Sequence, residues 1–541
     1  MYYMKSLLLK SCLFLVCCIM ITSCVKNVYI TDEEDKKEDI PEEEEKPTTI
    51  ALADLKIKRF TILPENNSGI YAQIDFEEDD SKVWTGIIYH YEADIAALKA
   101  TFEVVASRVT VNDVEQISNE TVNDFSKKQV YRLYATDGQY KDFEVKLEQG
   151  TRTGFPLVAI STDGNKPIVS RDKWLSGHIT IDMQQDERYE SYSGKIEIKG
   201  RGNNSWGLDK KPYAIKLLEK KAVMGMKKHK RWVLLANASD KTLLRNRTAF
   251  EIARRTGLAW TPDSRFVEVI LNGKYLGSYL LCEQIRVDEN RVNIAEMKSE
   301  DNEGESITGG YILECDRYYD EINKFRSAYR DLPINIKDPD EEVLTVKQKQ
   351  YITDYVNGVE KLLYGGESID PNYANFFDIK SFVDFWIVME LTHNNDTRLP
   401  GSCYMYKDRG GKLMAGPVWD FDLSTFIESR SFLLYNYEVT DFSKSGRSLW
   451  FKRLFEDPAF RACAKERWQS YKEQFEGIPQ FIDEEATYLE PSADVNWSMW
   501  KVNPGAGANK DLNLSWKEAV LKLRINYVNR LQWMDGEIQK W

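Results

Sequence analysis

The sequence predicts an α+β protein with an all-β region on its N-terminal side, and two observations support this. Residues 50–149 contain short runs that alternate apolar and polar residues, separated by turn signals such as Asn112-Asp113 and Asp137-Gly138. This spacing is typical of a small β-sandwich. From about residue 153, strand-like runs mix with amphipathic helical runs. We therefore expect an immunoglobulin-like (Ig-like) sandwich over residues 50–149 and a mixed domain over residues 153–541.

Residues 1–24 have the pattern of a secretory signal peptide. Lys5 and Lys10 give a basic start, and residues 13–21 form an apolar run too short to span a bilayer comfortably. The run ends in Ile21-Thr22-Ser23-Cys24, which resembles the lipobox of bacterial lipoproteins. The resemblance implies cleavage before Cys24 and lipidation of its sulfur. The alternative is an ordinary secretory signal with a chance cysteine.

Residues 25–49 predict an extended acidic tether. Between residues 32 and 46 there are ten acidic and three basic side chains, which repel one another and bury no apolar surface. An acidic stretch behind a lipid-bearing cysteine also resembles the surface-export signals of Bacteroides-type lipoproteins. We therefore expect a protein of the cell envelope, lipid-anchored at the outer membrane or cell surface of a Gram-negative bacterium.

The composition excludes some functions. The net charge is −13 and no basic face is evident, so we expect no nucleic-acid partner. The chain has only four histidines, which argues against a poly-histidine metal hydrolase. Four cysteines lie beyond the signal and lack metal-site spacing, so we expect buried small hydrophobic residues. These cysteines are Cys282, Cys315, Cys403 and Cys463.

The first part of the mixed domain reads as strands around a glycine-bearing loop. Residues 195–199 and 213–217 alternate as half-buried strands, and the loop Gly200–Gly207 joins them. Ser239 or Asp240 is placed to cap a helix that runs to about Arg255. Asn272-Gly273 then predicts a tight hairpin turn between two strands.

After Gly309-Gly310 the patterns are mainly helical. Thr345 and Gln348 form a capping box, and Asp378 is placed to cap the next helix. An amphipathic run near residues 521–531 predicts a C-terminal helix. Three tryptophans in this part are expected in the core or at its rim: Trp497, Trp500 and Trp516.

Two aspartates bracket one predicted β-hairpin, whose turn is Arg409-Gly410-Gly411. A hairpin brings its open ends together, so Asp396 before it and Asp420 after it should lie within a few ångströms. One such carboxylate can orient an acceptor hydroxyl while the other holds Mg²⁺ against phosphates. Two alternatives remain: aspartates that only cap turns, and the acid and base of a glycosidase.

Two further features fit phosphate chemistry. Lys216 lies on a strand fourteen residues after Gly202, where its ammonium could reach phosphate oxygens beside the glycine loop. A solvated strand lysine is the plainer alternative. Asp422 lies two residues beyond Asp420 and is either a second metal ligand or a turn residue.

Together these motifs resemble the spore-coat protein H (CotH) kinase family. The similarity covers roughly residues 155–541, and its motifs occur in the family's order. They are Arg201-Gly202-Asn203, Lys211-Pro212-Tyr213-Ala214-Ile215-Lys216, Leu234-Leu235-Ala236-Asn237, Leu243-Leu244-Arg245-Asn246, Leu271-Asn272-Gly273, Gly277-Ser278-Tyr279-Leu280-Leu281-Cys282-Glu283, Gly309-Gly310-Tyr311 and Trp419-Asp420-Phe421-Asp422.

The resemblance implies a bilobal, atypical protein-kinase-like fold that transfers the ATP γ-phosphoryl group to a protein serine or threonine with Mg²⁺ or Mn²⁺. It implies Asp396 as the catalytic residue and Asp420, with Asp422, as the metal site. The implied nucleotide-binding residues are Lys216, Arg201, Gly202, Asn203, Ser205 and, near an adenine-binding hinge, Glu283. Glu251 is either a partner for Lys216 or a solvated helix residue.

One departure from the kinase pattern concerns the catalytic loop. Kinases usually carry a metal-binding asparagine about five residues after the catalytic aspartate, where this chain has Gly401 and then Ser402. Leu399-Pro400 makes the loop unusual as well. The competing interpretation is therefore a catalytically degenerate kinase fold that serves as a glycan- or protein-binding surface lipoprotein.

Overall fold

The computed structural model describes residues 49–70, 73–88, 94–150, 153–394, 396, 400–423, 425–426, 431–436, 449–503 and 511–541. The predicted signal peptide, Cys24 and the tether up to residue 48 lie outside the described residues. By its internal contacts the chain separates into two units, residues 1–49 and Ile50–Trp541, and only the second is described below.

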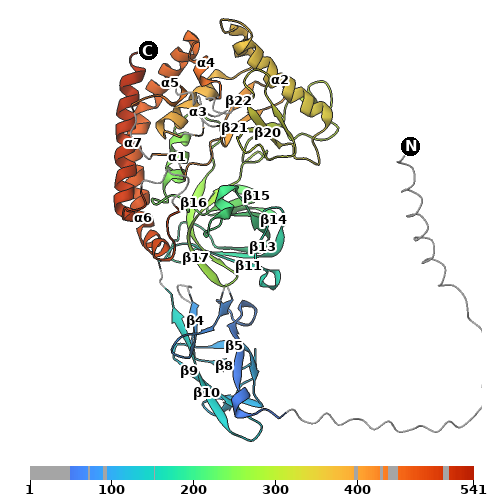
Figure 1. Ribbon diagram of the computed structural model, residues 1–541, viewed down its shortest axis with the longest axis vertical. Coiled ribbons are helices and arrows are strands. Elements are labelled where there is room, and N and C mark those ends of the chain that lie inside the picture. Colours follow the sequence, from blue (N-terminus) through green and yellow to red (C-terminus); the bar gives the residue numbers. More distant parts are fainter. Residues whose placement is uncertain are drawn as a thin grey trace, which may run out of the picture. The chain divides into compact units, whose positions relative to one another are not determined.

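Two sheets with a common core form the region after residue 50 (Figure 1). The first contains β2 (Ile74–Asp75), β1 (Lys56–Ile62), β5 (Leu98–Val105) and β8 (Val122–Asn123). The second contains β3 (Glu77–Glu78), β4 (Val83–Ile88), β10 (Tyr140–Gln149), β9 (Gln129–Tyr134), β6 (Arg108–Val111) and β7 (Val114–Glu115). Phe60, Tyr131 and Val145 are fully buried between them. The sheets agree with the expected all-β region, while its Ig-like character remains a prediction.

A closed seven-stranded barrel follows, which the sequence did not predict as a barrel. In order around it run β11 (Leu157–Thr162), β12 (Leu175–Asp182), β13 (Tyr192–Gly200), β14 (Tyr213–Val223), β15 (Met226–Leu235), β17 (Lys274–Glu283) and β16 (Ser264–Leu271). A parallel pairing of β11 with β16 closes the ring. Its interior holds alternate residues such as Ile196, Ile198 and Ile215, as a period of two requires.

The predicted hairpin at Asn272-Gly273 is confirmed. β16 pairs with β17 in antiparallel register up to Leu271 and Lys274. Asn272 has φ +50° and Gly273 has φ +79°, the left-handed backbone that a two-residue turn of this kind needs.

The remaining part combines helices with a sheet that the sequence analysis largely missed. The five-stranded sheet has the order β19 (Lys324–Arg326), β20 (Pro333–Asp338), β18 (Tyr311–Cys315), β21 (Cys403–Lys407) and β22 (Leu413–Ala415). The helices are α1 (Arg245–Arg254), α2 (Val346–Tyr364), α3 (Ile379–Leu391), α4 (Phe451–Leu454), α5 (Pro458–Glu476), α6 (Ile478–Met499) and α7 (Trp516–Ile538). Thr345 with Gln348 caps α2, and Asp378 caps α3, as expected.

Helix α1 begins later than predicted, so Ser239 or Asp240 as its cap is wrong. Leu243 has φ +62°, which no helical residue adopts, and the helix starts at Arg245. The Asp240 carboxylate instead accepts hydrogen bonds from the backbone N–H groups of Thr242 and Arg245 and forms a buried ion pair with the Arg245 side chain. A buried charge without a partner is strongly unfavourable, so the carboxylate pairs with the Arg245 side chain and does not cap the helix.

The barrel and the helical part share one packed core. Val233 of β15, with Leu280 and Cys282 of β17, faces outward from the barrel and joins the large cluster that contains α1, α3 and α7 residues. The α+β class is therefore confirmed, while the kinase-like bilobal arrangement remains a prediction. Within the described residues, no helix has both the length and the apolar character that a membrane crossing needs.

The predicted burial of cysteines and tryptophans holds. Cys282, Cys315 and Cys403 are buried free thiols and Cys463 is partly buried. Trp516 is buried, whereas the other two tryptophans of the C-terminal part pack at the rim of the core or of the barrel.

Candidate active site

The predicted acidic hairpin is present. β21 pairs with β22 through Met405 with Ala415 and Lys407 with Leu413, and Gly410 in the turn has φ +60°. The chain leaves the hairpin beside the point where it arrived, because the Gly416 N–H donates to the Tyr404 carbonyl at 2.9 Å. The segments carrying Asp396 and Asp420 therefore meet at the open end of the hairpin.

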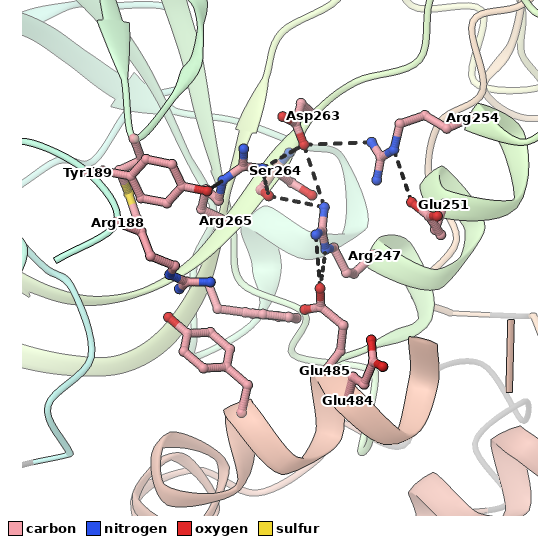
Figure 2. Close-up of a pocket in the computed structure, with 13 residues that line it drawn as sticks. Arg188, Tyr189, Arg247, Glu251, Arg254, Asp263, Ser264, Arg265, Glu484 and Glu485 are labelled. Carbon is pink, nitrogen blue, oxygen red and sulfur yellow. Dashed lines mark hydrogen bonds and ion pairs between the residues drawn. The ribbon is translucent and has the colours of Figure 1, made fainter. Parts of the chain in front are cut away.

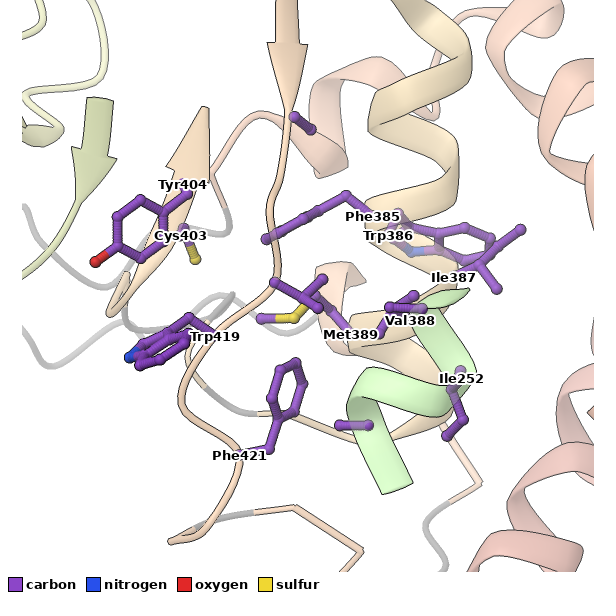
Figure 3. Close-up of a cluster of buried hydrophobic side chains, with 14 of the residues drawn as sticks. Ile252, Phe385, Trp386, Ile387, Val388, Met389, Cys403, Tyr404, Trp419 and Phe421 are labelled. Atoms are coloured by element: carbon purple, nitrogen blue, oxygen red, sulfur yellow. The ribbon is translucent and has the colours of Figure 1, made fainter. Parts of the chain in front are cut away.

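Apolar packing fixes the segment that carries Asp420. Trp419 and Phe421 are buried on either side of it, and Phe385 and Met389 of α3 belong to the same cluster (Figure 3). Asn246 of α1 accepts a hydrogen bond from the Phe421 N–H at 2.8 Å. Asp420 itself has φ +67°, a backbone conformation that costs a non-glycine residue free energy and that clusters at functional sites.

The three predicted aspartates influence one another electrostatically. Burial, and next the negative charge of Asp420, raises the pKa of Asp396 to about 7. The same two causes raise the pKa of Asp422 to about 8. The pKa of Asp420 is also raised, by the dense surrounding protein, although hydrogen bonds with Asp422 and Ser402 oppose the shift. Asp420 therefore lies close enough to Asp396 and Asp422 to raise the pKa of each, while the predicted separation of a few ångströms between Asp396 and Asp420 remains a prediction.

These carboxylates remain open to solvent. Asp420 is exposed, and the side chain of Asp396 keeps 18% of its surface accessible. The protein around Asp420 is dense enough to raise its pKa, yet its side chain is exposed. Solvent therefore reaches this carboxylate from one side. A ligand can therefore approach the cluster without unfolding of the chain.

Two arginines partly offset the acidic charge. Arg317 Nη1 donates to Asp396 Oδ1 at 3.2 Å. The Arg201 guanidinium lies over the Trp419 ring, 5.4 Å from its centroid, and its charge lowers the pKa of Asp420. Arg201, predicted in the glycine loop, is therefore brought to the cluster.

The structure explains the glycine where kinases carry asparagine. A Cβ atom at Gly401 would lie 2.7 Å from Arg317 Nη1 and 3.3 Å from Asp396 Cγ, so any side chain there would displace the ion pair. The next residue supplies a side-chain oxygen instead, since the Ser402 hydroxyl hydrogen-bonds with Asp420. Asp316 Oδ2 accepts from the Ser402 N–H at 2.9 Å and so holds that residue in place.

The rest of the glycine loop is partly exposed between β13 and β14, and Asn203 is its exposed predicted residue. Gly202 has φ +84°, and a Cβ there would collide with the Ser205 hydroxyl, so glycine is required. The Gly202 carbonyl and the Asn203 side-chain oxygen both accept from Arg171, at 2.8 and 2.6 Å. These bonds give the loop one defined conformation.

The surroundings of Lys216 differ from expectation. Its ammonium lies 2.6 Å from Glu197 Oε2 on the neighbouring strand β13. Glu251 is not its partner, because that carboxylate pairs with Arg254 at 3.1 Å and with Arg255 at 2.9 Å on its own helix.

Glu283 is occupied by structural contacts. Its buried carboxylate pairs with Arg291 at 2.7 Å and accepts from the Asp263 N–H at 3.0 Å. Its side chain is therefore committed within the fold, and a place near an adenine-binding hinge remains a prediction for this part of the backbone.

Sequence reasoning missed Arg317, Asp316 and Asn246 as neighbours of the cluster. A usable signal existed for the first two, since charged residues directly follow the buried strand β18. Asn246 belongs to one of the family motifs, but no local pattern indicates its role, because that role depends on α1 packing against the Trp419–Phe421 segment.

The donor set suits a hard divalent cation only in part. Among the described residues, no group of three or more His, Cys, Asp or Glu side chains has metal-site geometry. Magnesium, however, is commonly bound by one or two carboxylates together with substrate phosphates and water. Two aspartates and a serine hydroxyl are oxygen donors of the kind that Mg²⁺ and Mn²⁺ prefer.

Comparison with known proteins gives one informative result. No curated protein matches the sequence. A solved structure of a DUF4623 family protein from Bacteroides eggerthii DSM 20697 is 12% identical over 35% of this chain and 58% of that one, with a TM-score of 0.13. So low a score supports no argument. A family model described as CotH kinase protein matches residues 196–534, more than half of the chain. The chain therefore belongs to the CotH kinase family.

Proposed function

We propose that the protein transfers the γ-phosphoryl group of ATP to a serine or threonine hydroxyl of a protein acceptor. The observation that supports this most directly is the meeting of Asp396, Asp420 and Asp422 at the open end of the hairpin. Family membership supports nucleotide and divalent metal use in general terms. The acceptor class is our proposal.

Asp396 is the proposed proton acceptor. It would hold the acceptor hydroxyl by a hydrogen bond while the hydroxyl oxygen forms a bond to the γ-phosphorus and the bond from that phosphorus to the bridging oxygen breaks. The hydroxyl proton passes to the carboxylate and ADP leaves. Arg317, 3.2 Å from Asp396, holds the carboxylate in position.

Asp420 and Asp422, with the Ser402 hydroxyl, are the residues that would hold Mg²⁺ or Mn²⁺. A bound ion would neutralise charge on the β- and γ-phosphates. Trp419 and Phe421 anchor the segment of these aspartates in the core, so the two carboxylates would hold such an ion in a defined position.

The barrel side would bind the nucleotide. Arg201 lies next to the acidic segment, and the loop residues Gly202, Asn203 and Ser205 present backbone and side-chain groups to solvent. Lys216 would reach phosphate oxygens only by leaving Glu197, so its contribution depends on exchange of that ion pair. The backbone at Glu283 is the proposed adenine contact.

We also propose that Cys24 carries the lipid that anchors the protein in the cell envelope, at the outer membrane or cell surface. The pattern of residues 1–24 and the acidic residues that follow support this. Labelled fatty acid should enter the wild-type protein and the Cys18→Ser variant, and should be absent from Cys24→Ser. Label in the last variant would contradict the anchor.

Transfer of label from [γ-³²P]ATP tests the activity. The full-length protein is incubated with Mg²⁺ or Mn²⁺ and a generic protein acceptor, beside Asp396→Asn. Loss of the base should reduce transfer by about 10²- to 10⁴-fold. Asp354→Asn is the control, because that aspartate is exposed and its carboxylate accepts a hydrogen bond from Gln350 on the same helix, α2. Equal transfer by wild type and Asp396→Asn would contradict the assignment.

The second candidate function is that of a catalytically degenerate surface protein that binds glycans or proteins. The engagement of Lys216 with Glu197 favours it, since the proposed phosphate contact is already neutralised. The same assay separates the two: the degenerate protein shows no transfer and no thermal shift with ATP and Mg²⁺.

A further inference from the structure

A polar cavity lies away from the acidic hairpin. It has a volume of about 470 Å³ and lies among α1, α6, the start of β16 and the loop before β13 (Figure 2). It shares no residue with the Asp396, Asp420 and Asp422 cluster. Most of its lining residues are charged, and apolar groups such as Met224 and Phe266 supply the smaller part of the wall.

The charges in this wall are balanced. Four arginines face four acidic residues: Arg188, Arg247, Arg254 and Arg265 against Glu251, Asp263, Glu484 and Glu485. Arg265 lies 2.7 Å from Asp263, Arg247 lies 2.9 Å from Glu485, and Arg254 lies 3.1 Å from Glu251 (Figure 2). While these ion pairs are intact, their charges cancel, so the wall attracts neither anions nor cations strongly.

Two polar atoms of the wall have no partner. The Ser264 hydroxyl and Arg254 Nη2 are buried and make no hydrogen bond with any described residue. A buried polar group without a hydrogen bond costs about 1–3 kcal/mol, so such atoms are unusual in a folded protein. Both residues line the cavity, but the two atoms have almost no accessible surface in the free protein, so a ligand reaches them only after a small shift of the wall.

Flat groups line the outer end of the cavity. The Arg188 guanidinium lies 5.6 Å from the Tyr189 ring and 4.9 Å from the Tyr488 ring. Its side chain is 56% exposed, so it can move without disturbing the core. Tyrosine rings and guanidinium planes offer rigid contact area with polar edges.

A neighbouring cavity extends the site. It has a volume of about 650 Å³ and shares Arg188 and Tyr488 with the first. Its lining is mainly apolar, and Tyr488 and Pro491 of α6 contribute to it. Because the two cavities share residues, we treat them as one groove along α6.

We infer that this groove binds a neutral oligosaccharide. Hydroxyl groups both donate and accept hydrogen bonds, which matches a wall of paired guanidinium and carboxylate groups with two unmet hydrogen-bonding atoms. A phosphorylated or other anionic ligand would need an excess of positive charge, which the wall lacks. A hydrophobic peptide would bury the charged groups of the first cavity against apolar side chains, which is unfavourable. This binding is independent of phosphoryl transfer.

Affinity electrophoresis of the full-length protein in gels containing soluble mannan, xylan or starch tests the inference. At least one neutral polymer should retard wild type. Ser264→Ala should weaken that retardation about three- to tenfold, the effect of one lost hydrogen bond. The same variant should unfold no more easily than wild type, because the hydroxyl has no partner to lose in the free protein.

The chain offers a matched control. The Ser278 hydroxyl is also buried without a partner, but it lies on β17 outside the cavity, so Ser278→Ala should bind like wild type. Glu484→Ala, at an exposed wall position, should weaken binding without affecting the fold. Retardation by none of the neutral polymers would overturn the inference. So would equal effects of the two serine variants, or stronger retardation by heparin than by any neutral polymer.

Discussion

The acidic cluster and the charged groove contact different faces of one helix, and they treat charge in opposite ways. Asn246 of α1 contacts the segment of Asp420, whereas Arg247, Glu251 and Arg254 line the groove. The latter recur at intervals of three and four residues and so share a face. In the cluster, pKa values of carboxyl groups are raised; in the groove, arginines lower the pKa of Asp263 even though burial opposes them.

The difference indicates what each region lacks. Like charges held close together are unfavourable in the free protein and are relieved by a cation. Paired charges are already satisfied, so a ligand there competes for hydrogen bonds and not for charge. The first arrangement suits a metal-bound nucleotide, and the second suits an uncharged polar ligand.

The largest expected effect separates the regions by activity. Asp420→Asn should reduce phosphoryl transfer about 10²-fold or more, because the neutral amide cannot hold the cation against the phosphates. Glu485→Gln in the groove should change transfer less than about twofold. Rates with labelled ATP measure both variants, and comparable losses in the two would remove the distinction between the regions.

Features that depend on residues close together in the sequence could be predicted, and features that depend on distant residues could not. The acidic hairpin was predicted because its turn is local and its register follows from it. The helix caps at Thr345 and Asp378 were predicted for the same reason. Closure of the barrel was missed, because β11 pairs with β16 across more than 100 residues of sequence: Leu157 opposes Glu268.

The same limit applies to charged side chains. Neither the Arg317 contact with Asp396 nor the Glu197 contact with Lys216 has a sequence pattern, since tertiary folding alone brings the partners together. The groove was missed altogether, because its wall comes from four separate elements. The residue types indicated carboxylate chemistry. Ion pairs formed by tertiary folding decide which of the charged side chains can still bind a ligand.

The second prediction concerns the stability of the groove. Glu485→Ala should lower the free energy of unfolding by about 1–3 kcal/mol, because it leaves the mostly buried Arg247 guanidinium with the more distant Asp263, at 3.5 Å, as its nearest carboxylate, beside the Ser264 carbonyl at 3.2 Å. Urea unfolding measures this. The neighbouring Glu484→Ala should cost less than about 0.5 kcal/mol because that residue is exposed. If Glu485→Ala left the free energy of unfolding unchanged or raised it, the ion pair between Arg247 and Glu485 would not stabilise the fold.

The third prediction has the opposite sign. Asp420→Asn should raise the free energy of unfolding of the metal-free protein by about 0.5–1 kcal/mol, because it removes like charge beside Asp396 and Asp422, as often happens at functional sites. Urea unfolding in the presence of a chelator measures it. Destabilisation by this variant would mean that Asp420 is already paired in the free protein.

The smallest expected effect is the pH dependence of saccharide binding by the groove. The pKa of Asp263 is lowered from its ordinary value of about 4, so its ion pairs are present above that pH and are lost only as the pH falls through the lower, folded-state pKa. Between pH 5.5 and 8 the carboxylate therefore stays ionised, and affinity for the retarding polymer should change less than about twofold. The groups that face Asp263 are Arg247, Arg254, Arg265 and Glu283.

Three of these four groups are arginines, which stay charged across the range. Glu283 is buried against Arg291, and its raised pKa makes it the one facing group that could bring a pH dependence into the groove. Glu283→Gln separates the two sources: if binding weakens as the pH falls toward 5.5 in wild type but not in this variant, Glu283 and not Asp263 governs the wall. A steep dependence in both would contradict the view that the charges of the groove are already paired.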